Sequence, residues 1–132
     1  MAASSPFLIS LALVLVLISY CSLVTADSGT ATFYSSYGHS ACYGNKDQGV
    51  MIAAASDSFW NNGAACGHIY KVTCTGPTNA VPHPYTNTPT VTVKIVNHCP
   101  GCGGTIDLSK EAFAKIANPV AGVIKIEYQR IK

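Results

Sequence analysis

TVTVKIV, residues 90–96, is the stretch that decides the fold class. Val91, Val93 and Ile95 alternate with polar residues, so one side of the segment is apolar and the other side is polar. Successive side chains of a β-strand point to opposite sides, and strict alternation is therefore typical of a strand with one buried face. The segment predicts a strand in a sheet that covers a core.

The same alternation recurs before and after this segment. It is clear in residues 70–74 (YKVTC) and 123–131 (VIKIEYQRI), and weaker in residues 30–34 and 50–54. The side chains expected to face inward in the two clear segments are Tyr70, Val72, Cys74, Ile124, Ile126 and Tyr128. Several short strands of this kind predict a mainly β protein.

Helical spacing occurs in one place. Residues 110–117 repeat apolar side chains at three- and four-residue intervals, and Ser109 can cap the first turn. Pro119 ends this helix, because proline disfavours a helical conformation in the residue before it. A second short helix is expected to begin at Asp57, and the proline-rich residues 75–89 are interpreted as a surface loop.

The beginning of the chain differs from the rest. All 8 Lys and Arg and all 6 Asp and Glu lie after Ala26. Residues 7–18 are an apolar run, and Val24 and Ala26 stand at the two positions that a signal peptidase reads. Residues 1–26 are therefore predicted to be a secretory signal peptide that is cleaved after Ala26.

A membrane anchor is the alternative, but it needs about 20 apolar residues, and residues 19–22 (SYCS) interrupt the run too early. Residues 27–132 have the size of one domain with a single core and contain no second long apolar segment. We expect this domain to be a soluble monomer that is not inserted in a membrane. The formal net charge is +2 without a basic run, which argues against nucleic-acid binding.

Seven short strings carry a resemblance to a known family. They are ATFY (31–34), ACYG (41–44), MIAAASD (51–57), WNNGAACG (60–67), VTC (72–74), VKIV-x-x-C (93–99) and GTIDLSKEAF (104–113). Together, and in this order, they resemble the plant natriuretic peptide and blight-associated group of expansin-like proteins, which are also similar to family-45 endoglucanases. The resemblance implies a six-stranded double-psi β-barrel, as in barwin and the first domain of expansins, with one or two short helices.

Five cysteines remain after signal cleavage, and the resemblance implies a disulfide between Cys42 and Cys66. Relatives carry a further cysteine where this chain has Tyr85, so its usual partner, Cys74, is expected to be a free thiol that is either buried or paired between chains. Cys99 and Cys102 are interpreted as a loop disulfide. A redox pair or half of a zinc site are the alternatives, but no βαβ unit and no second ligand pair accompany them. No metal or cofactor is expected.

The resemblance also implies a polysaccharide groove. Asp107 matches the acid carboxylate of family-45 endoglucanases and an Asp of the expansin groove. Thr32 and Tyr34 match further groove positions, and Asn97 and His98 are expected nearby. The alternative for Asp107 is a structural carboxylate at the start of the following helix.

Glycoside hydrolysis ordinarily needs two carboxylates that flank the bond. Residues 32–39 (TFYSSYGH), where the hydrolases carry the second one, contain neither Asp nor Glu, and Asn97 stands where relatives often have Asp. An amide cannot act as a general base, so we expect no hydrolase activity. A lytic transglycosylase that uses Asp107 alone is the weaker enzymatic alternative.

The resemblance therefore implies a secreted, non-enzymatic protein of the apoplast and cell wall. Its expected role is in water and solute homeostasis and in stress responses, through a cell-surface receptor. The alternative partner is a cell-wall polysaccharide, which the protein would bind as a module related to expansins.

Overall fold

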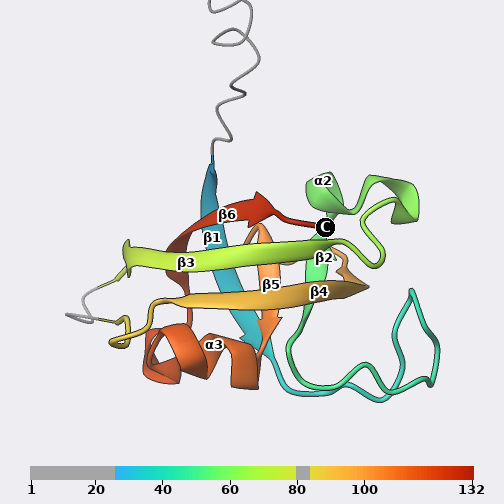
Figure 1. Ribbon diagram of the computed structural model, residues 1–132, viewed down its shortest axis with the longest axis horizontal. Helices are drawn as coiled ribbons and strands as arrows, with labels where there is room; N and C mark the ends of the chain where they lie inside the picture. Colours follow the sequence, from blue (N-terminus) through green and yellow to red (C-terminus); the bar gives the residue numbers. More distant parts are fainter. Residues whose placement is uncertain (1–25, 80–83) are drawn as a thin grey trace, which may run out of the picture.

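The computed structural model describes residues 26–79 and 84–132 (Figure 1). The predicted signal peptide lies outside these residues, except for Ala26. Within the described ranges, no helix has both the length and the apolar character needed to cross a bilayer.

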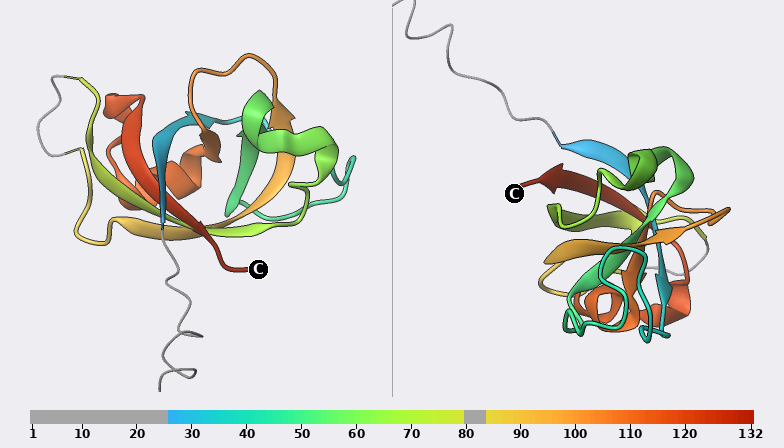
Figure 2. Two further views of the ribbon diagram at one scale, coloured as in Figure 1. Left: turned by 90° about the horizontal axis from the view of Figure 1, so that it is seen from above. Right: turned by 90° about the vertical axis from the view of Figure 1, so that its right-hand side faces the viewer.

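Six strands of the described chain close into one barrel, in the order β1-β5-β2-β4-β3-β6 (Figure 2). The strands are β1 Asp27–Tyr34, β2 Ile52–Ser56, β3 Ile69–Pro77, β4 Thr90–Cys99, β5 Ile106–Ser109 and β6 Ile124–Arg130. The helices are α2 Asp57–Trp60 and α3 Lys110–Ile116, with short 3-10 turns at Asn61–Gly63 and Pro119–Ala121. A closed barrel leaves no unpaired sheet edge, and it confirms the predicted six-stranded fold.

Two of the six strand pairs are parallel, β1 with β5 and β2 with β4. Parallel neighbours cannot be joined by a tight hairpin, so they bring together segments that are distant in the chain. As a result, β5 from the second half of the domain lies between β1 and β2 from the first half. This interleaving positions the site described below.

The barrel interior is filled by the side chains that alternation predicted. Val91, Val93 and Ile95 of β4 are all buried in one core cluster. On β1, the Phe33 ring packs against Phe113 of α3, with 4.9 Å between the ring centroids. Tyr34, the next residue, therefore lies on the outer face of the strand.

The strand β5 was not predicted. Its four residues, Ile106–Ser109, do alternate apolar and polar side chains, but this run has the minimum length for a strand pattern and leads directly into the predicted helix. A second difference concerns β3, which continues to Pro77 and thus includes the start of the segment interpreted as a loop. A register shift between Cys74 and Gly76 allows this extension to stay paired with β6.

Ser109 starts α3 as predicted. Its Oγ accepts a hydrogen bond of 3.0 Å from the Ala112 backbone N–H and donates one of 2.5 Å to the Val50 carbonyl. The helix packs against β1, β4 and β5, below β4 in Figure 1. The cap therefore joins the end of β5 to the segment that precedes β2.

A disulfide joins Cys42 to Cys66. It connects the loop after β1 with the segment after α2, where regular strand pairing is missing. Cys74 is a buried free thiol on the inner face of β3.

Candidate functional site

Four residues from four adjacent strands form a row. Register pairs Thr32 of β1 with Asp107 of β5, Asp107 with Ala54 of β2, and Ala54 with Asn97 of β4. Paired residues point to the same side of a sheet. Most of the residues that precede or follow them in the sequence point to the opposite side, into the buried core. These core residues are Ala31, Ala53, Ala55, Ile106 and Leu108. The row, which we call the polar row (Thr32, Asp107, Ala54 and Asn97), therefore lies on the outer face of the barrel.

Asp107 is the acidic member of the polar row. Its Oδ1 accepts a hydrogen bond of 2.8 Å from Thr32 Oγ1, and the residue is only 9% exposed. Burial raises the pKa of Asp107, while hydrogen bonds from Thr32 and Cys99 act in the opposite direction. A raised pKa keeps this carboxyl protonated to a higher pH than an ordinary aspartate.

Tyr34 lies two residues beyond Thr32 on the same face of β1. Burial raises the pKa of Tyr34, and the negative charge of Asp107 raises it further, so the phenol stays neutral. Its Oη and the Oγ of Ser56 are buried and have no hydrogen-bond partner among the described residues. A buried hydroxyl without a partner costs about 1–3 kcal/mol, so a water or ligand hydroxyl is favoured at both positions.

Asn97 closes the row on β4. Its side-chain oxygen accepts hydrogen bonds of 2.9 Å from the backbone N–H groups of Ala41 and His98. The amide therefore ties the loop after β1 to the end of β4. This role needs only an acceptor, and it is consistent with an amide in place of an acid.

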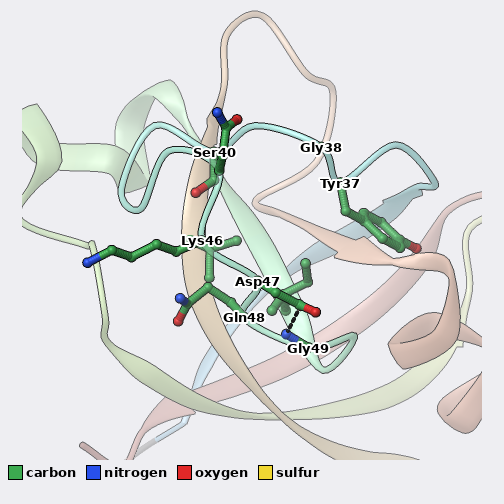
Figure 3. A pocket seen from close by; sticks show the side chains of 10 residues that line it. Tyr37, Gly38, Ser40, Lys46, Asp47, Gln48 and Gly49 are labelled. Atoms are coloured by element: carbon green, nitrogen blue, oxygen red, sulfur yellow. Dashed lines mark hydrogen bonds between the residues drawn. The ribbon is translucent and has the colours of Figure 1, made fainter.

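A pocket of about 370 Å³ lies beside the loop after β1 (Figure 3). Its lining includes Tyr37, Lys46, Asp47 and Gln48 but no member of the polar row. Inside it, the Gly49 N–H donates to Asp47 Oδ1 at 2.8 Å. The polar groups of this pocket belong to an exposed loop, and they hydrogen-bond to one another. They therefore do not indicate which ligand the pocket would bind.

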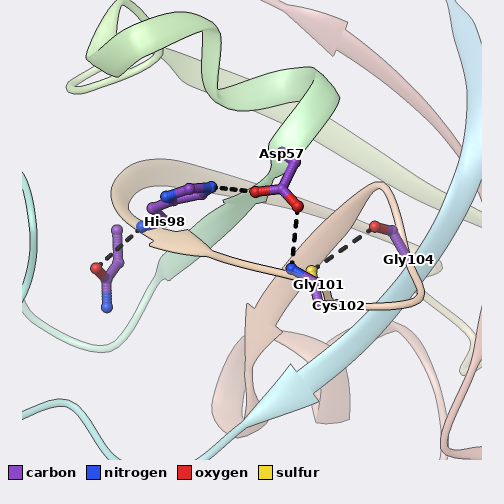
Figure 4. Close-up of polar contacts among 6 residues, drawn as sticks. Asp57, His98, Gly101, Cys102 and Gly104 are labelled. Carbon is purple, nitrogen blue, oxygen red and sulfur yellow. Dashed lines mark hydrogen bonds and ion pairs between the residues drawn. The ribbon is translucent and has the colours of Figure 1, made fainter.

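His98 belongs to a separate cluster (Figure 4). Its Nε2 lies 2.7 Å from Asp57 Oδ1, and its ring stacks on Trp60 with 4.9 Å between centroids. Asp57 Oδ2 also accepts a hydrogen bond of 3.1 Å from the Gly101 N–H, and these contacts lower the pKa of Asp57, Gly101 first. His98 thus lies next to Asn97, as expected, but its ring is directed to Asp57 and Trp60 and not into the polar row.

Asp57 and Trp60 were missing from the predicted site. The sequence did contain a signal, because the short helix expected to begin at Asp57 carries both residues. What it lacked was the pairing of Ala55 with His98, which brings α2 next to the end of β4.

The loop disulfide expected between Cys99 and Cys102 is not formed in the structure, and both residues are free thiols. In the structure the two sulfurs make hydrogen bonds in place of a bridge. Cys99 forms side-chain hydrogen bonds with Asp107 and Cys102, while Cys102 Sγ lies 3.8 Å from the Gly104 carbonyl oxygen (Figure 4). Cys99 thus contacts the site carboxyl, a role that sequence reasoning missed.

The number of carboxylic acids in the polar row limits the reactions that it could catalyse. Asp107 is its sole carboxylic acid, so the row does not provide the two carboxylates that glycoside hydrolysis ordinarily uses. In residues 26–79 and 84–132, no three His, Cys, Asp or Glu side chains are grouped so as to hold a metal ion. What the row provides is one carboxyl, several hydrogen-bonding groups and an aromatic neighbour.

Comparison with known proteins identifies the family. A family model described as lytic transglycolase matches residues 52–128. An EG45-like domain-containing protein of Arabidopsis thaliana is 58% identical over 114 residues, which are 86% of this chain and 90% of that protein. An EG45-like protein of Citrus jambhiri is 58% identical over 108 residues, 80% of this chain and 82% of its own length.

Among solved structures, a variant of the Clavibacter michiganensis expansin in complex with cellohexaose aligns with a TM-score of 0.62 and 28% identity. The alignment covers 82% of this chain and 51% of the expansin, so this chain spans about half the length of that protein. Fold and family model together define the class as double-psi β-barrel proteins. Within that class, the chain belongs to the EG45-like, expansin-related family, which confirms the resemblance seen in the sequence.

Proposed function

We propose that this protein acts outside the cell, in the plant cell wall, and binds wall polysaccharide across the polar row without cleaving it. The observation that carries the proposal is the Thr32–Asp107 pair, which holds a carboxyl on the outer face of the barrel. Further support comes from the likeness to an expansin that was crystallised with cellohexaose.

Each residue of the site would have a different role in binding a sugar. Asp107 accepts a hydrogen bond from a sugar hydroxyl when it is charged and can donate one when it is protonated. Thr32 holds the carboxyl in place. The neighbouring Tyr34 adds an apolar ring with a polar end, the combination that suits the mixed surface of a sugar.

A role without bond cleavage follows from the single carboxyl of the row. Asn97 offers an amide oxygen that is already engaged with two backbone N–H groups, so it supplies no general base. This argument supports a non-enzymatic protein and leaves Asp107 as a binding group.

Signalling is a second candidate. The chain covers 90% of an EG45-like protein at 58% identity, which favours a role shared with the natriuretic-peptide group to which the sequence is similar. In that role the protein would bind a cell-surface receptor and influence water and solute balance under stress. A low dose would then swell protoplasts, which have no wall to bind.

A binding assay on cellulose and matrix polysaccharides tests the first proposal. We expect the protein to be retained, and we expect Asp107→Ala to weaken retention about tenfold to a hundredfold, because a hydrogen bond to a charged group is worth about 1.5–3 kcal/mol. The control is Asp47→Ala, which removes an acid in the exposed loop beside the separate pocket.

Equal retention of both variants would contradict binding at the polar row. Lack of wall binding together with protoplast swelling would replace the first proposal with the second. Release of reducing ends or anhydro sugars that disappears in Asp107→Asn would instead establish an enzyme.

A further inference from the structure

The carboxyl of the polar row interacts with one thiol of a cysteine pair. Cys99 is the last residue of β4, two residues after Asn97 and paired with Ser56 of β2, so its side chain lies on the face of the polar row. It forms side-chain hydrogen bonds with Asp107 and with Cys102. Asp107 therefore has a partner on each side, Thr32 from β1 and Cys99 from β4.

The direction of the bond between Cys99 and Asp107 follows from electrostatics. Burial is the largest of the causes that raise the pKa of Cys99 to about 12, and its hydrogen bonds to Cys102 and Asp107 and the negative charge of Asp107 act in the same direction. At physiological pH the sulfur therefore carries its proton, and the thiol donates to the carboxylate. Cys99 is in this way a positioning residue for Asp107.

The backbone between the two cysteines keeps the thiols close. The Cys102 N–H donates to the Cys99 carbonyl at 3.4 Å, which closes a tight turn. Gly101 adopts a left-handed φ of 69° in this turn, which glycine allows at little cost. Its N–H is held by Asp57 at 3.1 Å, so the turn is attached to α2.

We propose that Cys99 and Cys102 form a redox-sensitive pair, whose reduced state gives the Asp107 carboxylate its second hydrogen-bond donor and whose oxidised state removes that donor. The dithiol of the structure and the loop disulfide suggested by the sequence are then two states of one site. The consequence for polysaccharide binding rests on the proposed function, but the effect on Asp107 does not.

Oxidation needs a co-reactant, for which a low-molecular-weight disulfide such as oxidised glutathione is sufficient. Cys102 gives its proton to water, and its sulfur attacks one sulfur of that disulfide, breaks its S–S bond, forms a mixed disulfide and releases one small thiolate, which takes up a proton. The Cys99 sulfur then attacks Cys102 Sγ and releases the second small thiol, while the Cys99 proton passes to Asp107 or to water. Two protein thiols lose two electrons, and one small disulfide gains them.

The groups that face Asp107 determine the effect of this change. Cys99 approaches from β4, while the Thr32 hydroxyl and the neutral Tyr34 phenol approach from β1. Hydrogen bonds to the charged carboxylate hold the pKa of Asp107 down against burial. Loss of the bond from Cys99 therefore raises the pKa of Asp107, and a smaller fraction of this carboxyl is charged in a mildly acidic wall.

The test is a titration of the Asp107 side-chain carbon by NMR, before and after treatment with oxidised glutathione. Mass mapping of the peptides with a thiol-alkylating reagent confirms which cysteines have reacted. We expect a Cys99–Cys102 disulfide to form and the pKa of Asp107 to shift upward, with reversal by a reducing agent that leaves Cys42–Cys66 intact. Glu111, which hydrogen-bonds to Tyr37 and not to the thiols, is the internal control and should titrate unchanged.

Cys102→Ser is the matched variant, because it keeps Cys99 as a donor but cannot form the bridge. Its Asp107 titration should resemble that of the reduced protein with or without glutathione. An equal upward shift in Cys102→Ser, a downward shift on oxidation, or no disulfide after treatment would each overturn the proposal. None of these readouts uses a polysaccharide, so a failure of the proposed function would appear separately, as absent wall binding by both redox states.

Discussion

Thr32 and Asp107 are 75 residues apart in the chain, and their side chains meet at 2.8 Å. They meet because β1 and β5 run in parallel and pair these two residues directly. The contact therefore depends on the closure of the whole barrel. It also means that the ionisation of one carboxyl reports on the integrity of the fold.

Removal of the hydroxyl at Thr32 should change this carboxyl. Thr32→Val keeps the shape of the side chain but removes a donor to Asp107, so the pKa of Asp107 should rise further. The free energy of unfolding should fall by about 1.5–3 kcal/mol at a pH where the carboxyl is charged. NMR titration and urea denaturation measure the two effects. Thr30→Val, two residues earlier on the same face, is the control and should leave the pKa of Asp107 in place.

The ionisation of Asp107 should make the free energy of unfolding depend on pH. The pKa of Asp107 is higher in the folded protein than the ordinary value of an aspartate, so the folded state binds more protons than the unfolded state between these two pKa values. The contribution of Asp107 to stability therefore falls as pH rises from the unfolded-state pKa to the folded-state pKa. Asp107→Asn removes the contribution. The stability of the variant relative to the unmodified protein should therefore increase with pH, as measured by urea denaturation between about pH 3 and pH 7.

Glu111→Gln should change the pH dependence of stability in the opposite direction to Asp107→Asn. The hydrogen bond from Tyr37 lowers the pKa of Glu111, so its contribution is present above the unfolded pKa and is lost as pH falls. The stability of this variant relative to the unmodified protein should decrease with pH. Slopes of the same sign for the two variants would contradict the assigned environments.

The disulfide should contribute more to stability than the thiols of the turn. Cys42 and Cys66 close a loop with a sequence separation of 24, for which chain entropy gives about 3.5 kcal/mol. Cys42→Ala should therefore lower the melting temperature clearly more than Cys102→Ala, which removes no bridge from the dithiol form. Calorimetry measures both, and equal melting temperatures would disprove this ranking.

Ser109 should be sensitive to truncation. Ser109→Ala removes both the cap on α3 and the hydrogen bond to the Val50 carbonyl, with an expected loss of about 1–3 kcal/mol. Asn118→Ala, which removes a cap from the exposed 3-10 turn after α3, is the comparison and should cost less. Urea denaturation of the two variants gives the difference, and a loss below that of Asn118→Ala would argue against the dual role of Ser109.

Local patterns predicted much of the barrel. Alternation located β3, β4 and β6, because each has one face in the core and one face in solvent. Helical spacing and the serine cap located α3. The same patterns missed β5, because its alternation spans only four residues and ends at the serine that caps α3.

Asp107, Thr32 and Tyr34 were identified by their similarity to a family, and the structure adds how they are arranged. The site at Asp107 also includes Cys99, which was interpreted only as half of a disulfide. His98 was expected near them, and in the structure its ring is directed to Asp57 and Trp60.

The sequence by itself determined the strand and helix character of most segments and the kinds of side chain available, because these depend on residues a few positions apart. Only the tertiary structure decided which of those side chains share a surface. The reason is that parallel pairing inserts β5 between β1 and β2, and register between strands distant in the chain leaves no trace in local spacing. The contact of one carboxyl with a threonine and a thiol therefore exists only in the closed barrel.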